Sequence, residues 1–557
     1  MIARIFRPPS FIYFFIICLI YLIVFTPAPG ISLADAGHDD GLFMQWSISI
    51  LDWQWLGPWN ALTTAKAPLH SLLTAVAASL GVNPFLYRRI FYLFGSLVFV
   101  LTALKKAPVW FRILTMVALL LDPFQFSPVS LRNLREGTYV PLQLMAFGFG
   151  SLSLDYLQKK YIDWRKFSAA IAATSASFGL ILITREARVI AWLELLIWLL
   201  LGVLVVALRT RGKGKKNLLV TALHAFLSIF IIIGIARIPV KIIAIFNDLN
   251  YQAEISNSIE EGAFPRFYGK LISIGQEDEP FLPRVPVSQS LLTQIINESG
   301  GQRTLGNVLK NLDPVWKRPG CEIYPQICSE YGGGWFMWAL RESIVKEITA
   351  IPEVKASEIS FQKIVKSLEN ELDDICRRST KIICNQARVG YFPSLDRWGF
   401  ENPIMESANE GVRILSLVAV PSIYPIGGYD LSNISSETRH HELATPLGIP
   451  SAKFIESTKW HRIFKIASII GIIAKCTIVA LSVARTYLIV SRSRPIVSLD
   501  LVSIWMLISL TIHILVYTLL GLTSFPGDGY VVMASPIFIS LFSRFSACTF
   551  PHKIINI

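Results

Sequence analysis

Apolar segments of about 20 residues recur along this chain, and they limit its fold more than any other feature. Each is close to the length that an α-helix needs to cross about 30 Å of hydrocarbon. Charged residues make up 16% of the 557 residues, against about a quarter in soluble proteins. We therefore expect an all-α polytopic membrane protein with about ten transmembrane helices. The expected spans are 11–27, 85–104, 108–122, 137–157, 167–183, 189–208, 217–238, 464–484, 499–522 and 530–548.

The short loops between these spans predict the orientation in the membrane. Lys and Arg gather in alternate loops, and the positive-inside rule places such loops in the cytoplasm. With ten spans, both termini then face the cytoplasm, and the first span is an uncleaved signal anchor. The net charge of +13 is explained by this topology, so nucleic acid is not an expected partner. The apolar segment 67–82 is short for a span. It is interpreted as an interfacial or re-entrant helix, with a marginal span as the alternative.

The chain divides into three predicted parts. Residues 1–239 form a membrane module with spans one to seven and an outer acidic loop at 28–84. Residues 240–460 are polar enough for a large extracytoplasmic domain between spans seven and eight, mainly helical. Residues 461–557 carry spans eight to ten. Helices are expected in the outer domain at 287–312, 335–350 and 357–376, the last two amphipathic.

Four cysteines lie in the predicted outer domain, as the pairs Cys321 with Cys328 and Cys376 with Cys384. Spacings of seven and eight residues suit two local disulfides in an oxidising compartment. A zinc site and cross-pairing between the couples are the alternatives. The expected location is a bacterial inner membrane with the large domain in the periplasm, although an endoplasmic-reticulum membrane would satisfy the same physics.

An acidic cluster follows the first span, and its centre is the adjacent pair Asp39 and Asp40. Two carboxylates beside a bilayer repel anionic head groups, so they fit best where they handle a proton, a metal or a sugar. A solvated surface or a helix cap is the plainer alternative. Tryptophans of the same loop suit an interfacial belt, or stacking against a sugar ring. The acidic residues and His are Asp35, His38, Asp39, Asp40 and Asp52, and the tryptophans are Trp46, Trp53, Trp55 and Trp59.

Several arginines lie where short outer loops meet helices, against the positive-inside bias. They need a local reason, such as carboxylate partners or an anionic ligand, and the planar guanidinium suits phosphate. An ion-pair network that holds the loops together is the alternative. Lys475, midway along the eighth span, is a functional candidate or half of a structural pair. The outer charged residues are Arg88, Arg89, Arg132, Arg135, Glu136, Arg185, Glu186 and Arg188.

Three short motifs resemble the GT-C superfamily of integral-membrane glycosyltransferases, in particular bacterial members distantly like protein mannosyltransferases and lipid A sugar transferases. The first is the acidic pair after span one. The second is the run Leu56-Gly57-Pro58-Trp59-Asn60-Ala61-Leu62-Thr63-Thr64-Ala65-Lys66-Ala67-Pro68. The third is Thr184-Arg185-Glu186, which is similar to the Thr-Arg-Glu-Glu of such proteins.

The resemblance implies inverting transfer of a sugar from a polyprenyl-phosphate donor to an acceptor hydroxyl on the outer face of the membrane. The acceptor is a lipid, a glycan or a protein. Asp39 or Asp40 is the expected general base. The donor phosphate would be bound by one or more arginines, oriented by Glu136 and Glu186, and a divalent metal is an option that nothing requires. The candidate phosphate ligands are Arg88, Arg89, Arg135 and Arg185.

Two other classes of function remain open. A transporter for a lipid-linked substrate would place polar or broken helices near the midplane of the membrane. A non-catalytic scaffold of the cell envelope would use the large outer domain as its working part.

Overall fold

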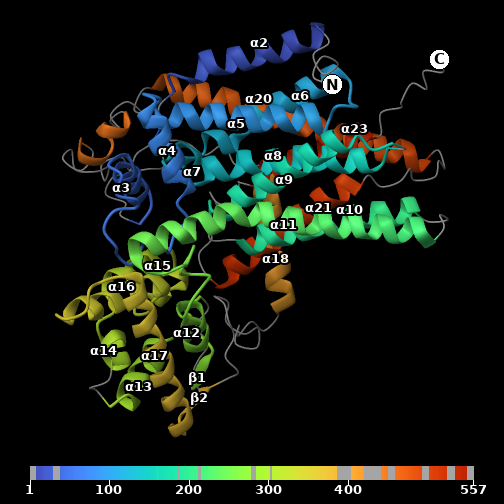
Figure 1. The fold of residues 1–557 in the computed structure, drawn as a ribbon. Coiled ribbons are helices and arrows are strands. Elements are labelled where there is room, and N and C mark those ends of the chain that lie inside the picture. The colour runs from blue at the N-terminus through green and yellow to red at the C-terminus, as the bar shows by residue number, and fades with distance from the viewer. Residues whose placement is uncertain are drawn as a thin grey trace.

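The computed structural model describes most of the chain. The described residues are 8–28, 30, 38–159, 161–185, 188–210, 215–276, 284–300, 304–384, 403–419, 441–449, 458–491, 501–523 and 534–548. Figure 1 shows a bundle of long, roughly parallel helices with a smaller helical domain beside one end.

Each predicted span corresponds to a helix of the bundle. Six helical segments are long and apolar enough to cross a membrane, so the protein is an integral membrane protein. The other helices, α2, α8, α9 and α23, lie among them, and a total of ten spans stays a prediction. The bundle helices are α2 (Pro8–Phe25), α5 (Pro84–Thr102), α6 (Val109–Leu120), α8 (Glu136–Leu157), α9 (Trp164–Leu182), α10 (Arg188–Thr210), α11 (Lys215–Tyr251), α20 (Thr458–Ser491), α21 (Leu501–Thr523) and α23 (Ser535–Cys548).

Helix α8 is the central helix of the bundle, and it packs closely against α5. A methyl group at Gly95 of α5 would lie 2.7 Å from the backbone oxygen of Pro141 in α8, so only glycine permits this approach. Deeper in the bundle, the ring of Trp505 lies 5.0 Å from that of Phe147, and its indole nitrogen donates to the backbone oxygen of Glu194 at 3.1 Å. Small residues and satisfied polar groups therefore join the helices, as is typical within a membrane.

Lys475 is part of a structural pair, which was the alternative left open by the sequence. Its ammonium group is buried, lies 3.9 Å from a carboxylate oxygen of Asp122 and donates to the Ser535 hydroxyl at 2.6 Å. It also donates to the backbone oxygen of Val418 in α18 (Pro403–Ala419). Four separate segments are thus joined at one buried charge, which satisfies the ammonium away from water.

Helix α11 is longer than the predicted span 217–238. It continues through Pro239 to Tyr251, and Ile229–Tyr251 is the segment of it that is long and apolar enough to cross a membrane. Proline removes one backbone donor, but a membrane helix tolerates it when neighbouring helices pack against the freed groups. This extension carries the chain from the bundle directly into the smaller domain (Figure 1).

The smaller domain has its own hydrophobic core, which includes Phe264, Phe336, Leu340 and Phe361. The predicted helix 287–312 is two helices, because Gly300 takes a φ of +74° between them. A short antiparallel pair of strands, which the sequence did not predict, aligns Gly275 with Ile383. Its elements are α12 (Phe264–Leu271), β1 (Ile274–Gln276), α13 (Gln289–Glu298), α14 (Thr304–Lys310), η2 (Pro314–Lys317), α15 (Arg318–Ile323), η3 (Pro325–Ile327), α16 (Gly333–Ala350), α17 (Glu358–Arg378) and β2 (Ile382–Cys384).

Both local disulfides are present in this domain. Cys321 pairs with Cys328, and Cys376 pairs with Cys384. The second bond ties the end of α17 to strand β2. The prediction of local pairing is therefore confirmed, and the zinc alternative does not apply to these four cysteines.

Later residues of the predicted outer domain return to the bundle. Helix α18 packs against α21, and its Ile414 and Val418 belong to the core of the bundle. The turn η7 (Thr445–Leu447) packs against two short outer helices, α3 (Asp40–Leu51) and α4 (Leu69–Ser79). The described part of the separate domain core thus spans residues 259–382, together with Ala65 from the first outer loop.

Candidate functional site

Figure 1 places α3, α4 and α7, the elements next to most of the predicted acidic and basic residues, at the end of the bundle nearer the smaller domain. The start of α3 supplies the acidic pair, and the loop between α3 and α4 supplies Lys66. The segment between α7 (Pro128–Leu131) and α8 supplies Arg132 and Asn133. The start of α8 supplies Glu136, and Arg185 follows the end of α9.

Asp39 and Asp40 have different environments although they are adjacent. Asp40 is fully buried; one carboxylate oxygen accepts from Arg132 Nε at 3.0 Å, and the other accepts from the backbone N–H of Asn133 at 3.0 Å. The side chain of Asp39 is 32% exposed, and its carboxylate lies 3.0 Å from Lys66 Nζ and 3.9 Å from the Arg132 guanidinium. Asp40 is therefore enclosed, whereas Asp39 can be reached by a ligand.

The surroundings shift the pKa values of the two carboxyl groups in opposite directions. Burial alone would raise the pKa of Asp39, but the charges of Lys66 and Arg132 hold it below its ordinary value. Burial raises the pKa of Asp40, and Arg132 opposes that rise only in part. Asp39 is consequently the carboxyl group that is ionised over the whole physiological range.

Lys66 connects the acidic pair with the smaller domain. Its ammonium group is buried, donates to the backbone oxygen of His38, and lies 5.4 Å from the centre of the Trp338 ring. The His38 ring nitrogen lies 3.0 Å from a carboxylate oxygen of Glu342 in α16. Burial alone would raise the pKa of Glu342, but hydrogen bonds from His38 and Trp316 lower it.

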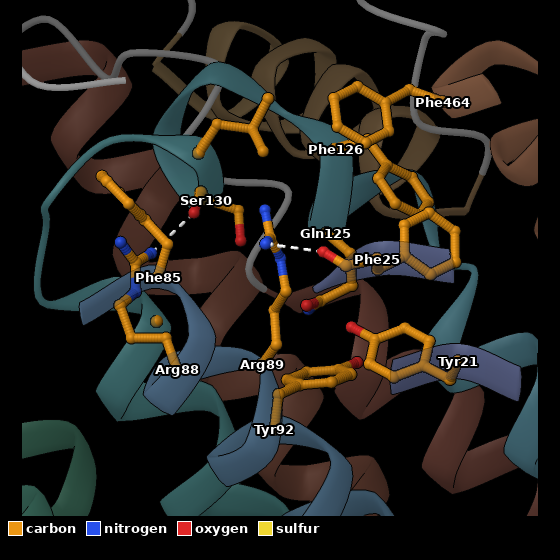
Figure 2. Close-up of a pocket in the computed structure, with 12 residues that line it drawn as sticks. Tyr21, Phe25, Phe85, Arg88, Arg89, Tyr92, Gln125, Phe126, Ser130 and Phe464 are labelled. Atoms are coloured by element: carbon orange, nitrogen blue, oxygen red, sulfur yellow. Dashed lines mark hydrogen bonds between the residues drawn. The ribbon is translucent and has the colours of Figure 1, made fainter. Parts of the chain in front are cut away.

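Arg88 and Arg89 line a pocket between α2, α5 and the turn η1 (Pro123–Phe126), shown in Figure 2. The pocket holds about 490 Å³ of space, part of it open to solvent. Arg88 donates to the backbone oxygen of Ser130 at 2.6 Å and to that of Arg132, so it also supports the segment that carries Arg132. Arg89 donates to the backbone oxygen of Phe25 at 2.7 Å.

The other predicted arginines lie closer to the acidic pair. Arg135 is buried, with its guanidinium 5.2 Å from the centre of the Phe43 ring in α3. Arg185 lies 3.9 Å from a carboxylate oxygen of Glu136, which is almost fully buried at the start of α8. A carboxylate suits this position because the positive end of the helix dipole favours negative charge. Glu186 lies outside the described residues.

Sequence reasoning left Lys66 and His70 out of the candidate site, and it named Arg132 among the outer arginines but not among the phosphate ligands. The imidazole of His70 lies 3.1 Å from the Asn133 side chain and 3.1 Å from the Thr138 hydroxyl. Burial, followed by the charge of Arg88, lowers the pKa of His70 to about 3, so the ring is neutral. Lys66 stands inside the run 56–68 and Arg132 just before Arg135, but only contacts across the fold reveal their partners.

Metal binding has no dedicated group of ligands in the described parts of the chain. Within those parts, no three His, Cys, Asp or Glu side chains are arranged to hold an ion.

The fold and this cluster define an integral membrane protein with a charged cluster where the helical bundle meets the smaller domain. The chain is similar to the crystal structure of ArnT from Cupriavidus metallidurans in the apo state, with 14% identity, 97% of this chain and 76% of that chain covered, and a TM-score of 0.33. It is also similar to ArnT from the same organism bound to undecaprenyl phosphate, with 12% identity, the same coverage and a TM-score of 0.29.

At these TM-scores the likeness carries no argument about chemistry. The chain matches no protein-family model and no curated protein sequence. Any function must therefore be argued from the residues of the site.

Proposed function

We propose that this protein is an inverting membrane glycosyltransferase. It transfers a sugar from a polyprenyl-phosphate donor to an acceptor hydroxyl on the outer face of a bacterial inner membrane, with the smaller domain in the periplasm. One observation carries the proposal: a reachable, ionised carboxylate, Asp39, lies among clustered cations where the bundle meets the smaller domain.

The charge of the cluster suits an anionic lipid headgroup. Among its described residues, five cationic side chains face three carboxylates, which leaves an excess of two positive charges. A polyprenyl-phosphate sugar is a phosphodiester with a single negative charge, and its leaving phosphate gains another during transfer. Fixed guanidinium groups can stabilise that developing charge. The cations are Lys66, Arg88, Arg132, Arg135 and Arg185, and the carboxylates are Asp39, Asp40 and Glu136.

The geometry favours Asp39 over Asp40 as the general base. In the proposed step the acceptor oxygen bonds to the anomeric carbon, its proton moves to Asp39, and the bond from that carbon to the phosphate oxygen breaks. Polyprenyl phosphate leaves with the bonding electrons. Asp40 would instead position Arg132, because both of its oxygens already accept hydrogen bonds from the 132–133 segment.

Release of polyprenyl phosphate is the direct test. Purified protein in liposomes would be given polyprenyl-phosphate hexoses and pentoses with a periplasmic glycolipid extract as acceptor, and the freed lipid phosphate would be measured by mass spectrometry. We expect wild-type protein to release it and Asp39→Asn to be inactive. Arg185→Ala should turn over more slowly, because the leaving phosphate loses a nearby charge.

Asp163→Asn is the matched control, because Asp163 is an exposed carboxylate that caps the opposite end of α9 from Arg185. This variant should be fully active. Full activity in Asp39→Asn would contradict the assignment of the base. A wild-type protein that neither binds undecaprenyl phosphate in native mass spectrometry nor releases lipid phosphate would instead support the scaffold alternative.

A further inference from the structure

The loop 56–66 between α3 and α4 is held by the smaller domain. Ala65 is fully buried in the hydrophobic core of that domain, beside residues such as Phe264 and Phe361. The backbone N–H of Ser258, at the start of the domain, donates to the Thr64 backbone oxygen at 2.9 Å. Ala65 of this loop is therefore part of the domain core, and the next residue, Lys66, is part of the acidic site.

Glu358 contacts two residues of this loop, Trp59 and Thr64. It is the first residue of α17 and is fully buried. One of its carboxylate oxygens accepts from Trp59 Nε1 at 3.0 Å and from the Thr64 hydroxyl at 2.7 Å. The other accepts from the Gln362 side chain at 2.7 Å. Every one of these hydrogen bonds is charge-assisted, which makes them stronger than neutral ones.

Thr64 has a backbone conformation that needs such support. Its φ is +64°, in the left-handed region, where a β-branched residue is a clear outlier. A strained residue of this kind persists only when its surroundings over-determine it. Besides Glu358, the Ser258 hydroxyl lies 3.0 Å from the Thr64 hydroxyl, and Arg341 donates to the Ala61 backbone oxygen at 3.0 Å.

We propose that Glu358 is a positioning residue: from the smaller domain it holds Thr64 in the left-handed conformation, and this places Lys66 against Asp39. Lys66 stands two residues after Thr64, so the direction of the chain at Thr64 decides where its side chain points. The structural part stands on the contacts alone. Its consequence for turnover rests on the proposed function, in which Asp39 is the base.

Chemical protection of Lys66 tests the structural part without any activity. The amine would be labelled with sulfo-NHS acetate in the full-length purified protein, and acetylation followed by peptide mass spectrometry. Lys66 is 5% exposed, so we expect slow labelling in wild type and labelling several-fold faster in Glu358→Gln. The control is Glu371→Gln, the same change on the same helix, because Glu371 accepts from the Leu305 N–H and does not contact the loop.

A second substitution separates positioning from a general loss of structure. Glycine adopts a left-handed φ without penalty. Thr64→Gly combined with Glu358→Gln should therefore return Lys66 to slow labelling, which a merely unfolded domain would not do. If Glu358→Gln does not fold, Ser258→Ala leaves Glu358 in place and removes another contact to Thr64, together with the hydrogen bond that the Ser258 hydroxyl accepts from Arg341. It should speed the labelling in the same direction. If folded Glu358→Gln protein labels Lys66 as slowly as wild type does, the inference is wrong.

The pH profile of turnover tests the consequence. In Glu358→Gln the acid limb should move to higher pH, because a displaced Lys66 no longer lowers the pKa of Asp39. Arg132 and Arg135 still face Asp39, with Asp40 and His38 adjacent, so the limb shifts rather than disappears. If Glu358→Gln labels Lys66 fast but its acid limb stays at the wild-type pH, the proposed consequence for turnover is wrong. Absence of turnover in wild type would instead count against the proposed function and leave the labelling result intact.

Discussion

Lys66 Nζ lies 3.0 Å from Asp39 Oδ1, although the two residues are 27 positions apart in the chain. The pair joins the start of α3 to the end of the loop that the smaller domain holds. A cation held at this distance keeps a partly buried carboxylate ionised, and the rest of the cluster is arranged around the same contact.

Asp40→Asn should destabilise the protein far more than Asp39→Asn. Asp40 is fully buried against Arg132, and removing one partner of a buried ion pair costs about 3–5 kcal/mol. Asp39 is partly exposed, so its replacement should lower the melting temperature less than that of Asp40, while transfer is lost. Thermal unfolding followed by tryptophan fluorescence checks both variants, and equal melting temperatures would contradict this division of roles.

Lys66→Met should move the acid limb of the activity profile to higher pH. Lys66 lowers the pKa of Asp39, and without it burial raises that pKa with less opposition. Because folding lowers the pKa of Asp39, its pairing with Lys66 stabilises the folded protein at pH values above the pKa of an unfolded aspartate, about 3.9. That contribution is lost as the pH falls through the folded value. The melting temperatures of wild type and Lys66→Met should therefore begin to converge as the pH falls below about 4, and a difference that stays constant at lower pH would contradict the pairing.

Gly95→Ala should weaken the bundle by about 1–3 kcal/mol, as overpacking does. The new methyl group would meet backbone atoms of Pro141, which cannot move without separating α5 from α8. Gly202→Ala in α10 is the control, because its methyl group would only touch Leu157 at 3.9 Å. That control should be neutral or stabilising by up to about 1 kcal/mol. Melting temperatures in one detergent decide the comparison.

Removing the Cys376–Cys384 disulfide should destabilise the smaller domain by about 2–3 kcal/mol, as expected for a short closed loop. The bond ties the end of α17 to strand β2. Mass spectrometry after alkylation without reduction should find all four cysteines of the smaller domain protected. Alkylation of Cys376 in the untreated protein would contradict the assigned bond.

Deleting the smaller domain does not separate a transferase from a scaffold. The loop 56–66 packs into the core of that domain through Ala65, and Glu358 holds Thr64. Loss of function on deletion is therefore expected for a transferase as well. Point substitutions at Asp39 distinguish the two functions, because they leave the domain in place.

Much of the candidate site followed from local sequence, but its pairing did not. The acidic pair, Arg88 and Glu136 stand at or near helix starts, and Arg185 follows the end of α9, so their place at one end of the bundle could be predicted. The exposure of Asp39 and the burial of Asp40 could not, because adjacent residues on a helix differ only in what other segments place against them.

The sequence by itself determined the class of protein, the helical bundle and the two local disulfides. These follow from hydropathy over about 20 residues and from short cysteine spacings, both properties of neighbouring residues. Only the tertiary structure decided that Lys475 pairs with Asp122, that α11 extends into the smaller domain, and that Glu358 contacts Thr64. The physical reason is that contacts between segments 294 or more residues apart, such as Thr64 with Glu358, depend on packing that no local pattern encodes.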